Sequence, residues 1–178
     1  MKGFLLKIKI MEKKLRTWGR YQKGKIRIPI NDYLIELFEK EIADGNELKV
    51  CIGTDSQRHG GNTKYTTVVL VLVKGKGGMI IHTSESRKNL HSINEKMIAE
   101  IGITIEIAQE ICWVMDLYDI EIEIHADINS DPQWPSHVAL KEAMGWVVGM
   151  GYAFKCKEKG DLSAFAASHC ADRICKNK

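Results

Sequence analysis

The stretch "LKVCIGTDSQRHGGNTKYTTVVLVLVKGKGGMIIHTSES", from Leu48 to Ser86, contains three apolar runs separated by two glycine-rich links. The middle run, "YTTVVLVLV", is rich in β-branched residues and almost continuously apolar, which is typical of a strand buried on both faces. The links "RHGGNTK" and "KGKGG" are short, and short links that contain glycine join antiparallel neighbours. The stretch therefore predicts a meander of three antiparallel strands, the first of which ends near Asp55.

Residues on either side of this meander follow helical and strand periodicities in turn. Ser92 and Glu95 have the spacing of a capping box at the start of a long amphipathic helix. Ser136 is a candidate cap of a later helix, and Asp161 or Ser163 is a candidate cap of the last one. The predicted helices are 28–47, 92–117, 135–150 and 161–176, and the two further strands are 120–127 and 152–157. This order predicts an α/β fold. We predict a five-stranded mixed sheet in which three antiparallel strands are followed by βαβα crossovers, with helices on both faces.

The composition is that of an ordinary globular protein. The chain has 178 residues, of which 44% are hydrophobic and 28% charged, which suits one domain with a sizeable core. Five cysteines without a CxxC pair argue against a disulfide framework or a zinc ribbon, so we expect a reducing, cytoplasmic location. No apolar run approaches the length of a membrane span, and "MKGFLLKIKIM" lacks the cleavage site of a signal peptide.

The charge is distributed unevenly, although the net charge is only +3. We predict a basic N-terminal arm over residues 1–30, followed by a single domain over residues 31–178. Trp18 and Tyr21 lie among the basic residues, so the arm could follow a phosphate backbone; alternatively, it only increases solubility. Against the single acid Glu12, its basic residues are Lys2, Lys7, Lys9, Lys13, Lys14, Arg16, Arg20, Lys23, Lys25 and Arg27.

Two aspartates end predicted strands of this sheet. Asp55 follows the first strand in "IGTDSQ", and Asp127 ends the fourth in "HADIN". If the first crossover returns beside the first strand, these carboxylates lie next to each other at one end of neighbouring strands. The alternative is ordinary turn chemistry, which is the interpretation we prefer for Asn129–Pro132.

Two further acids interrupt apolar helical stripes. Glu100 lies on the stripe that contains Met97, Thr104 and Ile107, and Asp172 follows Ser168 at helical spacing. An ionised carboxylate on a core-facing stripe is unfavourable unless it is paired or binds a metal. The alternatives are a glutamate that pairs with a lysine at the edge of the stripe and a solvent-facing polar face around Asp172.

Four carboxylates that converge need cations to remain charged. Asp55, Glu100, Asp127 and Asp172 supply only oxygen ligands, which hard divalent ions prefer. We therefore predict two Mg²⁺ or Mn²⁺ ions in a site that hydrolyses phosphodiesters. His125, His169 and the loop residue His59 are candidate proton carriers, and His125 could instead orient a carboxylate.

The motifs "IGTDSQ", "EKMIAEIGITIEIA", "HADIN" and "SAFAASHCAD" together resemble the ribonuclease H-like superfamily, and most closely its YkuK-type family of predicted nucleases. The resemblance covers roughly Leu48 to Lys176 and excludes the basic arm. It implies a ribonuclease H-like fold with Asp55, Glu100, Asp127 and Asp172 as the metal-binding acids. The chain departs from the family pattern in "KCKEKGD", where a Lys-Pro is expected, so Lys155 and Lys157 are only candidate phosphate contacts.

The resemblance also favours one kind of nuclease. Proofreading exonucleases carry D-x-E on the first strand, whereas this chain has Asp55-Ser56-Gln57, which favours internal cleavage. We expect cleavage of RNA or an RNA/DNA hybrid, read through its A-form backbone. The alternatives are a nuclease for branched or single-stranded DNA, a non-catalytic nucleic-acid-binding module and a plain scaffold. Further candidate phosphate contacts are Arg58, Lys64, Arg87 and Lys88.

Overall fold

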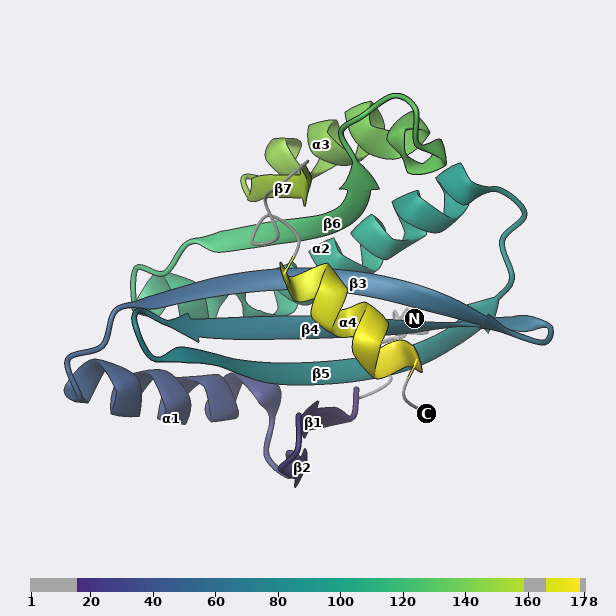
Figure 1. The fold of residues 1–178 in the computed structure, drawn as a ribbon. Helices are drawn as coiled ribbons and strands as arrows, with labels where there is room; N and C mark the ends of the chain where they lie inside the picture. Colours follow the sequence, from purple (N-terminus) through teal and green to yellow (C-terminus); the bar gives the residue numbers. More distant parts are fainter. Residues whose placement is uncertain (1–15, 159–165, 177–178) are drawn as a thin grey trace, which may run out of the picture.

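The computed structural model describes residues 16–158 and 166–176, which form one sheet covered by helices (Figure 1). Strands β1 (Trp18–Arg20) and β2 (Gly24–Lys25) precede helix α1 (Ile30–Ala43). The meander consists of β3 (Leu48–His59), β4 (Asn62–Val73) and β5 (Gly77–Lys88). Helix α2 (Ile93–Leu117), strand β6 (Ile122–Asn129), the 3₁₀ helix η1 (Pro135–Ala139), α3 (Leu140–Gly149), β7 (Ala153–Lys157) and α4 (Ala166–Lys176) follow.

The strand order is β2-β1-β5-β4-β3-β6-β7. Strands β3, β4 and β5 pair antiparallel, whereas β6 pairs parallel with β3 and β7 pairs parallel with β6. This topology confirms the predicted α/β fold with an antiparallel meander followed by crossovers. The sheet has seven strands rather than the five predicted, because β1 and β2 from the predicted basic arm extend it along the edge of β5.

The two faces of the sheet are covered by different helices. On one face, β3 residues such as Val50 and Ile52 join a large core with α1, α2 and α3. On the other face, Cys51 and Val68 pack with Ala167, Ala171 and Ile174 of α4 in a small cluster. Both faces of the central strands are therefore buried, which explains the nearly continuous apolar run that predicted β4.

Helix α4 lies unusually close to the sheet at Gly53. A Cβ atom on Gly53 would lie 2.5 Å from the backbone nitrogen of Ser168 and 2.9 Å from both the carbonyl carbon of Ala167 and the carbonyl oxygen of His125. No side chain fits in that space, because real Cβ contacts are not this short. Glycine at this position, together with small residues on the facing side of α4, lets the helix approach the backbone of β3.

Helix α2 begins with the predicted cap. The side chain of Ser92 accepts a hydrogen bond from the backbone of Glu95, whose side chain accepts one from the backbone of Ser92. Ser136 does not cap a helix: its hydroxyl accepts a hydrogen bond from the backbone N–H of Asn129, and η1 instead begins after Trp134. The predicted caps Asp161 and Ser163 lie outside the described residues. No helix in the ranges 16–158 and 166–176 has the length and apolarity that crossing a membrane would need.

Candidate active site

Asp55 lies in the interior of β3 rather than at its end. The strand continues to His59, because β4 keeps pairing with it from Thr66, opposite Asp55, out to Asn62. The prediction that the strand ends near Asp55 is therefore wrong. An opening next to Asp55 nevertheless exists, on the side of β3 that faces β6. The ladder between β3 and β6 stops at Ile52 and Ile124. Asp55 therefore lies where two parallel strands part, the usual place for a ligand in an open α/β sheet.

The carboxylate of Asp55 is buried with incomplete hydrogen bonding. Its side chain is 7% exposed, and its Oδ2 atom has no hydrogen-bond partner. Burial raises the pKa of Asp55 to about 7; Lys96 opposes this increase, whereas Asp172 and Asp127 add to it. A buried acceptor without a donor is unfavourable, and it is the kind of group that a cation satisfies.

Glu100 projects from α2 toward the same end of β3. Its carboxylate is 4% exposed, accepts a hydrogen bond of 2.7 Å from Ser56 Oγ and lies 3.5 Å from Lys96 Nζ. Burial raises the pKa of Glu100 to about 8; Lys96 opposes this increase and the charge of Asp55 adds to it. Glu100 is thus buried, as its place on the core-facing stripe predicted, and it is also paired with a lysine, as the alternative interpretation predicted.

Asp127 lies at an irregularity of β6. The pairing of β6 with β7 shifts register between Ala126 and Asn129, and such bulges often redirect a side chain next to an active site. The partly exposed Asp127 carboxylate lies 3.5 Å from Lys157 Nζ. Downstream, the side chain of Asn129 accepts a hydrogen bond from the backbone of Asp131, so the segment after Asp127 is the predicted polar turn.

Asp172 is on α4, on the opposite face of the sheet from Glu100. Its Oδ1 atom accepts a hydrogen bond of 3.4 Å from Gln57 Nε2 of β3, and its Oδ2 atom accepts one of 2.7 Å from Lys176 Nζ. The contact with Gln57 places the Asp172 carboxylate beside the part of β3 that contains Asp55, two residues away in the strand. The opposite faces therefore contribute one acid each to a site that opens at the end of the strands.

The four acids form an electrostatically coupled group, although they come from four elements. Asp127 and Asp172 each raise the pKa of Asp55, and Asp55 raises that of Glu100. Three lysines, Lys96, Lys157 and Lys176, each neutralise one acid. The sequence identified Lys157 only as a candidate phosphate contact. It did not identify Lys96 and Lys176, although they stand four residues from Glu100 and Asp172, the spacing of helical ion pairs.

The three candidate histidines have different environments. His59 is exposed at the end of β3, not in a loop. His169 is exposed on α4, three residues before Asp172. His125 is 2% exposed; its Nδ1 atom accepts a hydrogen bond of 3.2 Å from the backbone N–H of Ala167, and its Nε2 atom lies 3.5 Å from Glu123 Oε2. Burial lowers the pKa of His125, so the neutral ring is favoured. This geometry suits a supporting role for His125 more than transfer of a proton to a substrate.

Cys51, Glu123 and His125 form a second, fully buried group whose ligand atoms all lie within 4.8 Å of one another, a spacing that could hold a metal ion. In the described residues the four acids do not form a group that compact. However, the hydrogen bond from Ala167 assigns the ring proton of His125 to Nε2. That proton points to Glu123, so a metal could bind Nε2 only after the proton leaves.

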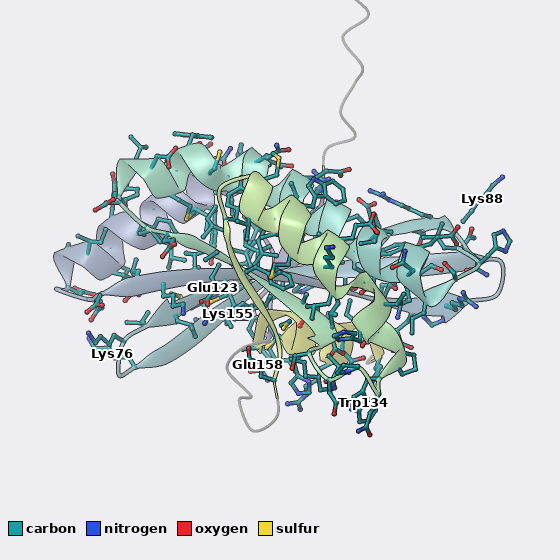
Figure 2. The ribbon with its side chains drawn as sticks, turned by 90° about the horizontal axis from the view of Figure 1, so that it is seen from above. Lys76, Lys88, Glu123, Trp134, Lys155 and Glu158 are labelled. Atoms are coloured by element: carbon teal, nitrogen blue, oxygen red, sulfur yellow. The ribbon has the colours of Figure 1, made fainter. Side chains whose placement is uncertain are left out.

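The candidate phosphate contacts fall into three groups. Arg87 is engaged on the α2 face, where it lies 5.9 Å from the ring centroid of Tyr65 and pairs with Glu85 and Glu106. Lys155 and Lys157 lie on β7. Lys155 Nζ is 3.9 Å from Oε1 of Glu123 on the neighbouring strand β6, and Figure 2 shows Lys155 and Glu123 close together. The other three lie toward the β3–β4 turn and the end of β5: Arg58, Lys64 and Lys88.

A family model described as ribonuclease H-like matches residues 33–176. The match includes every element from β3 to α4 and all four acids of the site. The chain therefore belongs to the ribonuclease H-like family, as the sequence motifs predicted. No curated protein matches the chain.

Proposed function

We propose that the protein is a divalent-metal-dependent nuclease that hydrolyses phosphodiester bonds in RNA or an RNA/DNA hybrid, by internal cleavage. The observation that carries this proposal is the coupling of four acids, Asp55, Glu100, Asp127 and Asp172, where β3 and β6 part. A structural role does not require two buried carboxylates whose pKa values are raised by burial and, in addition, by the charges of neighbouring acids. Such perturbed acids are typical of functional sites.

The residues of the site fit Mg²⁺ or Mn²⁺. All four side chains offer carboxylate oxygens, which these hard cations prefer, and Asp55 Oδ2 is a buried acceptor without a donor. The lysines at Glu100, Asp127 and Asp172 are cations that two bound metal ions would replace. When bound, such ions supply an activated water and stabilise the leaving oxygen of an in-line displacement.

The protein groups around the acids have distinct tasks in this proposal. Ser56 and Gln57 hold Glu100 and Asp172 by hydrogen bonds from adjacent positions of β3, which fixes the two carboxylates relative to each other. Lys96, Lys157 and Lys176 are close enough to meet substrate phosphates once they leave the acids. His169 is exposed beside Asp172 and is our candidate for protonating the leaving group.

Basic residues beyond the acids supply the substrate contacts. Arg58 and Lys88 are exposed near one end of the meander, and Figure 2 shows Lys88 at the periphery of the molecule. Contacts of this kind recognise a backbone rather than a base sequence. An A-form duplex, whose minor groove displays 2′-hydroxyls, is the substrate class we infer from the family and from these contacts.

The test is a cleavage assay with labelled RNA, hybrid, single-stranded DNA and branched DNA, each with EDTA, Mg²⁺ or Mn²⁺. We expect cleavage of RNA or hybrid with metal only. Asp127→Asn and Asp172→Asn should each reduce the rate by more than about 100-fold, since even residues that only support a metal ligand cost 10- to 100-fold. Asp131→Asn is the matched control, because Asp131 lies in the turn after β6 and caps the backbone of Gln133.

Each outcome separates the alternatives. Cleavage confined to DNA would replace the RNA substrate by a DNA substrate on the same site. Binding without cleavage under any metal would indicate a non-catalytic nucleic-acid-binding module. Equal rates for Asp127→Asn and wild type would exclude the four-acid site as the centre of the reaction.

A further inference from the structure

A buried chain of hydrogen bonds and ion pairs connects the middle of the sheet with the first turn of α4. The backbone N–H of Ala167, the second residue of α4, donates to His125 Nδ1 on β6 at 3.2 Å. His125 Nε2 lies 3.5 Å from Glu123 Oε2 on the same strand. This hydrogen bond joins the imidazole on β6 to the first described turn of α4, so the ring holds the helix from outside.

The Glu123 carboxylate is itself held by several groups. Lys49 of β3 pairs with it, Lys155 of β7 lies 3.9 Å away, and the thiol of Cys51 donates to its Oε2 atom at 3.9 Å. Glu123 is 6% exposed. The Glu123 carboxylate, which two lysines fix, accepts a hydrogen bond from Nε2–H of His125. This keeps Nδ1 unprotonated and able to accept a hydrogen bond from the backbone N–H of Ala167.

Further along α4, two more hydrogen bonds join the helix to the sheet: Gln57 Nε2 donates to Asp172 Oδ1, and Cys175 Sγ donates to the carbonyl oxygen of Lys64 at 3.6 Å. The buried residues of α4 are mostly small, namely Ala167, Ser168 and Ala171, with Ile174 and Cys175 in the last turn. At Gly53 it meets the sheet backbone to backbone, with no room for a side chain at that position. The hydrogen bond from Ala167 N–H to His125 therefore fixes the first turn of the helix in a way that contacts between small side chains do not.

We propose that Glu123 and His125 are positioning residues that fix the register of α4 on the sheet and thereby place Asp172 among the other acids. Asp172 lies five residues after Ala167 in the same helix, so a shift of α4 moves it away from Asp55. The consequence for metal binding rests on the proposed function, whereas the position of α4 can be measured independently of it.

Two isosteric variants separate the two nitrogen atoms of His125. In His125→Asn, the amide oxygen occupies a position close to Nδ1 and can accept from Ala167, but the contact with Glu123 is lost. In His125→Gln, the amide reaches the position of Nε2 and can donate to Glu123, but the acceptor for Ala167 is lost. His125→Phe removes both contacts and retains the ring volume.

The primary measurement is hydrogen–deuterium exchange of the full-length protein, read separately in peptides that cover α4 and β3–β5. We expect the amides of α4 to exchange at least about tenfold faster in His125→Gln and His125→Phe, as the loss of one buried hydrogen bond implies. In His125→Asn they should exchange at nearly the wild-type rate. Exchange in β3–β5 should stay the same in all three variants, which also shows that they fold.

A second measurement reports the ring itself. In ¹⁵N-NMR spectra of the wild type, His125 Nδ1 should have the shift of an unprotonated nitrogen that accepts a hydrogen bond, and Glu123→Gln should change it. Binding of Mn²⁺, followed by electron paramagnetic resonance, should weaken about tenfold or more in His125→Gln but not in His125→Asn.

The outcomes separate this proposal from the nuclease proposal. Unchanged exchange of α4 in both His125→Gln and His125→Phe, or a protonated Nδ1 in the wild type, would overturn the positioning role. If exchange of α4 changes as expected while the wild type neither binds Mn²⁺ nor cleaves any substrate, the positioning role stands and the proposed function is wrong.

Discussion

Replacement of Glu100 by glutamine should stabilise the metal-free protein at high pH while it removes metal-dependent activity. Glu100 has an ordinary pKa of 4.5 that burial raises to about 8, and its side chain is 4% exposed. Since each tenfold change in a protonation constant corresponds to about 1.4 kcal/mol, keeping this carboxylate ionised costs the fold on the order of 4 to 5 kcal/mol at pH 9.

The sign of the pH dependence follows from the direction of the shift. Between pH 4.5 and about 8 the folded state holds a proton on Glu100 that the unfolded state has released. The stability that Glu100 contributes is therefore complete below pH 4.5 and is lost as the pH rises through 8. Glutamine cannot ionise, and it can still accept the hydrogen bond from Ser56, so Glu100→Gln removes this loss.

The assay is urea denaturation in EDTA at pH 5, 7 and 9. We expect the wild type and Glu100→Gln to have similar unfolding free energies at pH 5, and Glu100→Gln to be more stable by roughly 2 to 4 kcal/mol at pH 9. Glu106→Gln is the matched control: it is the same change on the same helix, at a side chain that is 52% exposed, and should change stability by less than about 1 kcal/mol. A Glu100→Gln variant that is less stable than wild type at pH 9, or whose advantage is independent of pH, would refute the reasoning.

Three further predictions concern other parts of the structure. Gly53→Ala should lower the unfolding free energy by about 1 to 3 kcal/mol, because its Cβ would lie 2.5 Å from the backbone of Ser168, whereas Gly61→Ala, with open space around it, should have little effect; equal denaturation midpoints would contradict this. Ser92→Ala should cost about 1 kcal/mol through loss of the capping box, and an unchanged thermal midpoint would show that α2 does not depend on its cap. Burial raises the pKa of Asp55 to about 7, so Mn²⁺ affinity measured by calorimetry should rise about tenfold from pH 6 to pH 8, with release of protons; an affinity independent of pH would argue against Asp55 as a ligand.

The meander and α2 could be predicted from sequence because their signals are local. Val68–Val71 form an apolar β-branched run, and the Ser92–Glu95 capping box needs only three residues of separation. Strands β1 and β2 were missed because they are three and two residues long, too short for a periodicity. Their pairing is decided by contacts with β5, more than sixty residues away in the sequence.

The candidate site, too, could be predicted from the sequence only in part. Each acid was identified because it interrupted an apolar pattern or ended a predicted strand, and the topology then predicted that the four would meet. The departure of β6 from β3 after Ile124 and the irregularity at Asp127 depend on three strands at once, so no single segment encodes them. The tautomer of His125 likewise depends on a backbone group 42 residues away.

The short strands β1 and β2 also affect how the molecule behaves at high concentration. Without them, β5 would expose one continuous edge of twelve residues, and long exposed edges are templates for pairing between molecules. Trp18–Arg20 pairs with Ile81–Thr83 in the middle of that edge, which leaves only short uncovered segments at its two ends. The new outer strand, β2, is just Gly24 and Lys25, and a short edge strand that ends in a lysine is a poor partner for another sheet. Residues that first suggested a phosphate-binding arm thus cover the middle of an edge that could otherwise pair with another molecule.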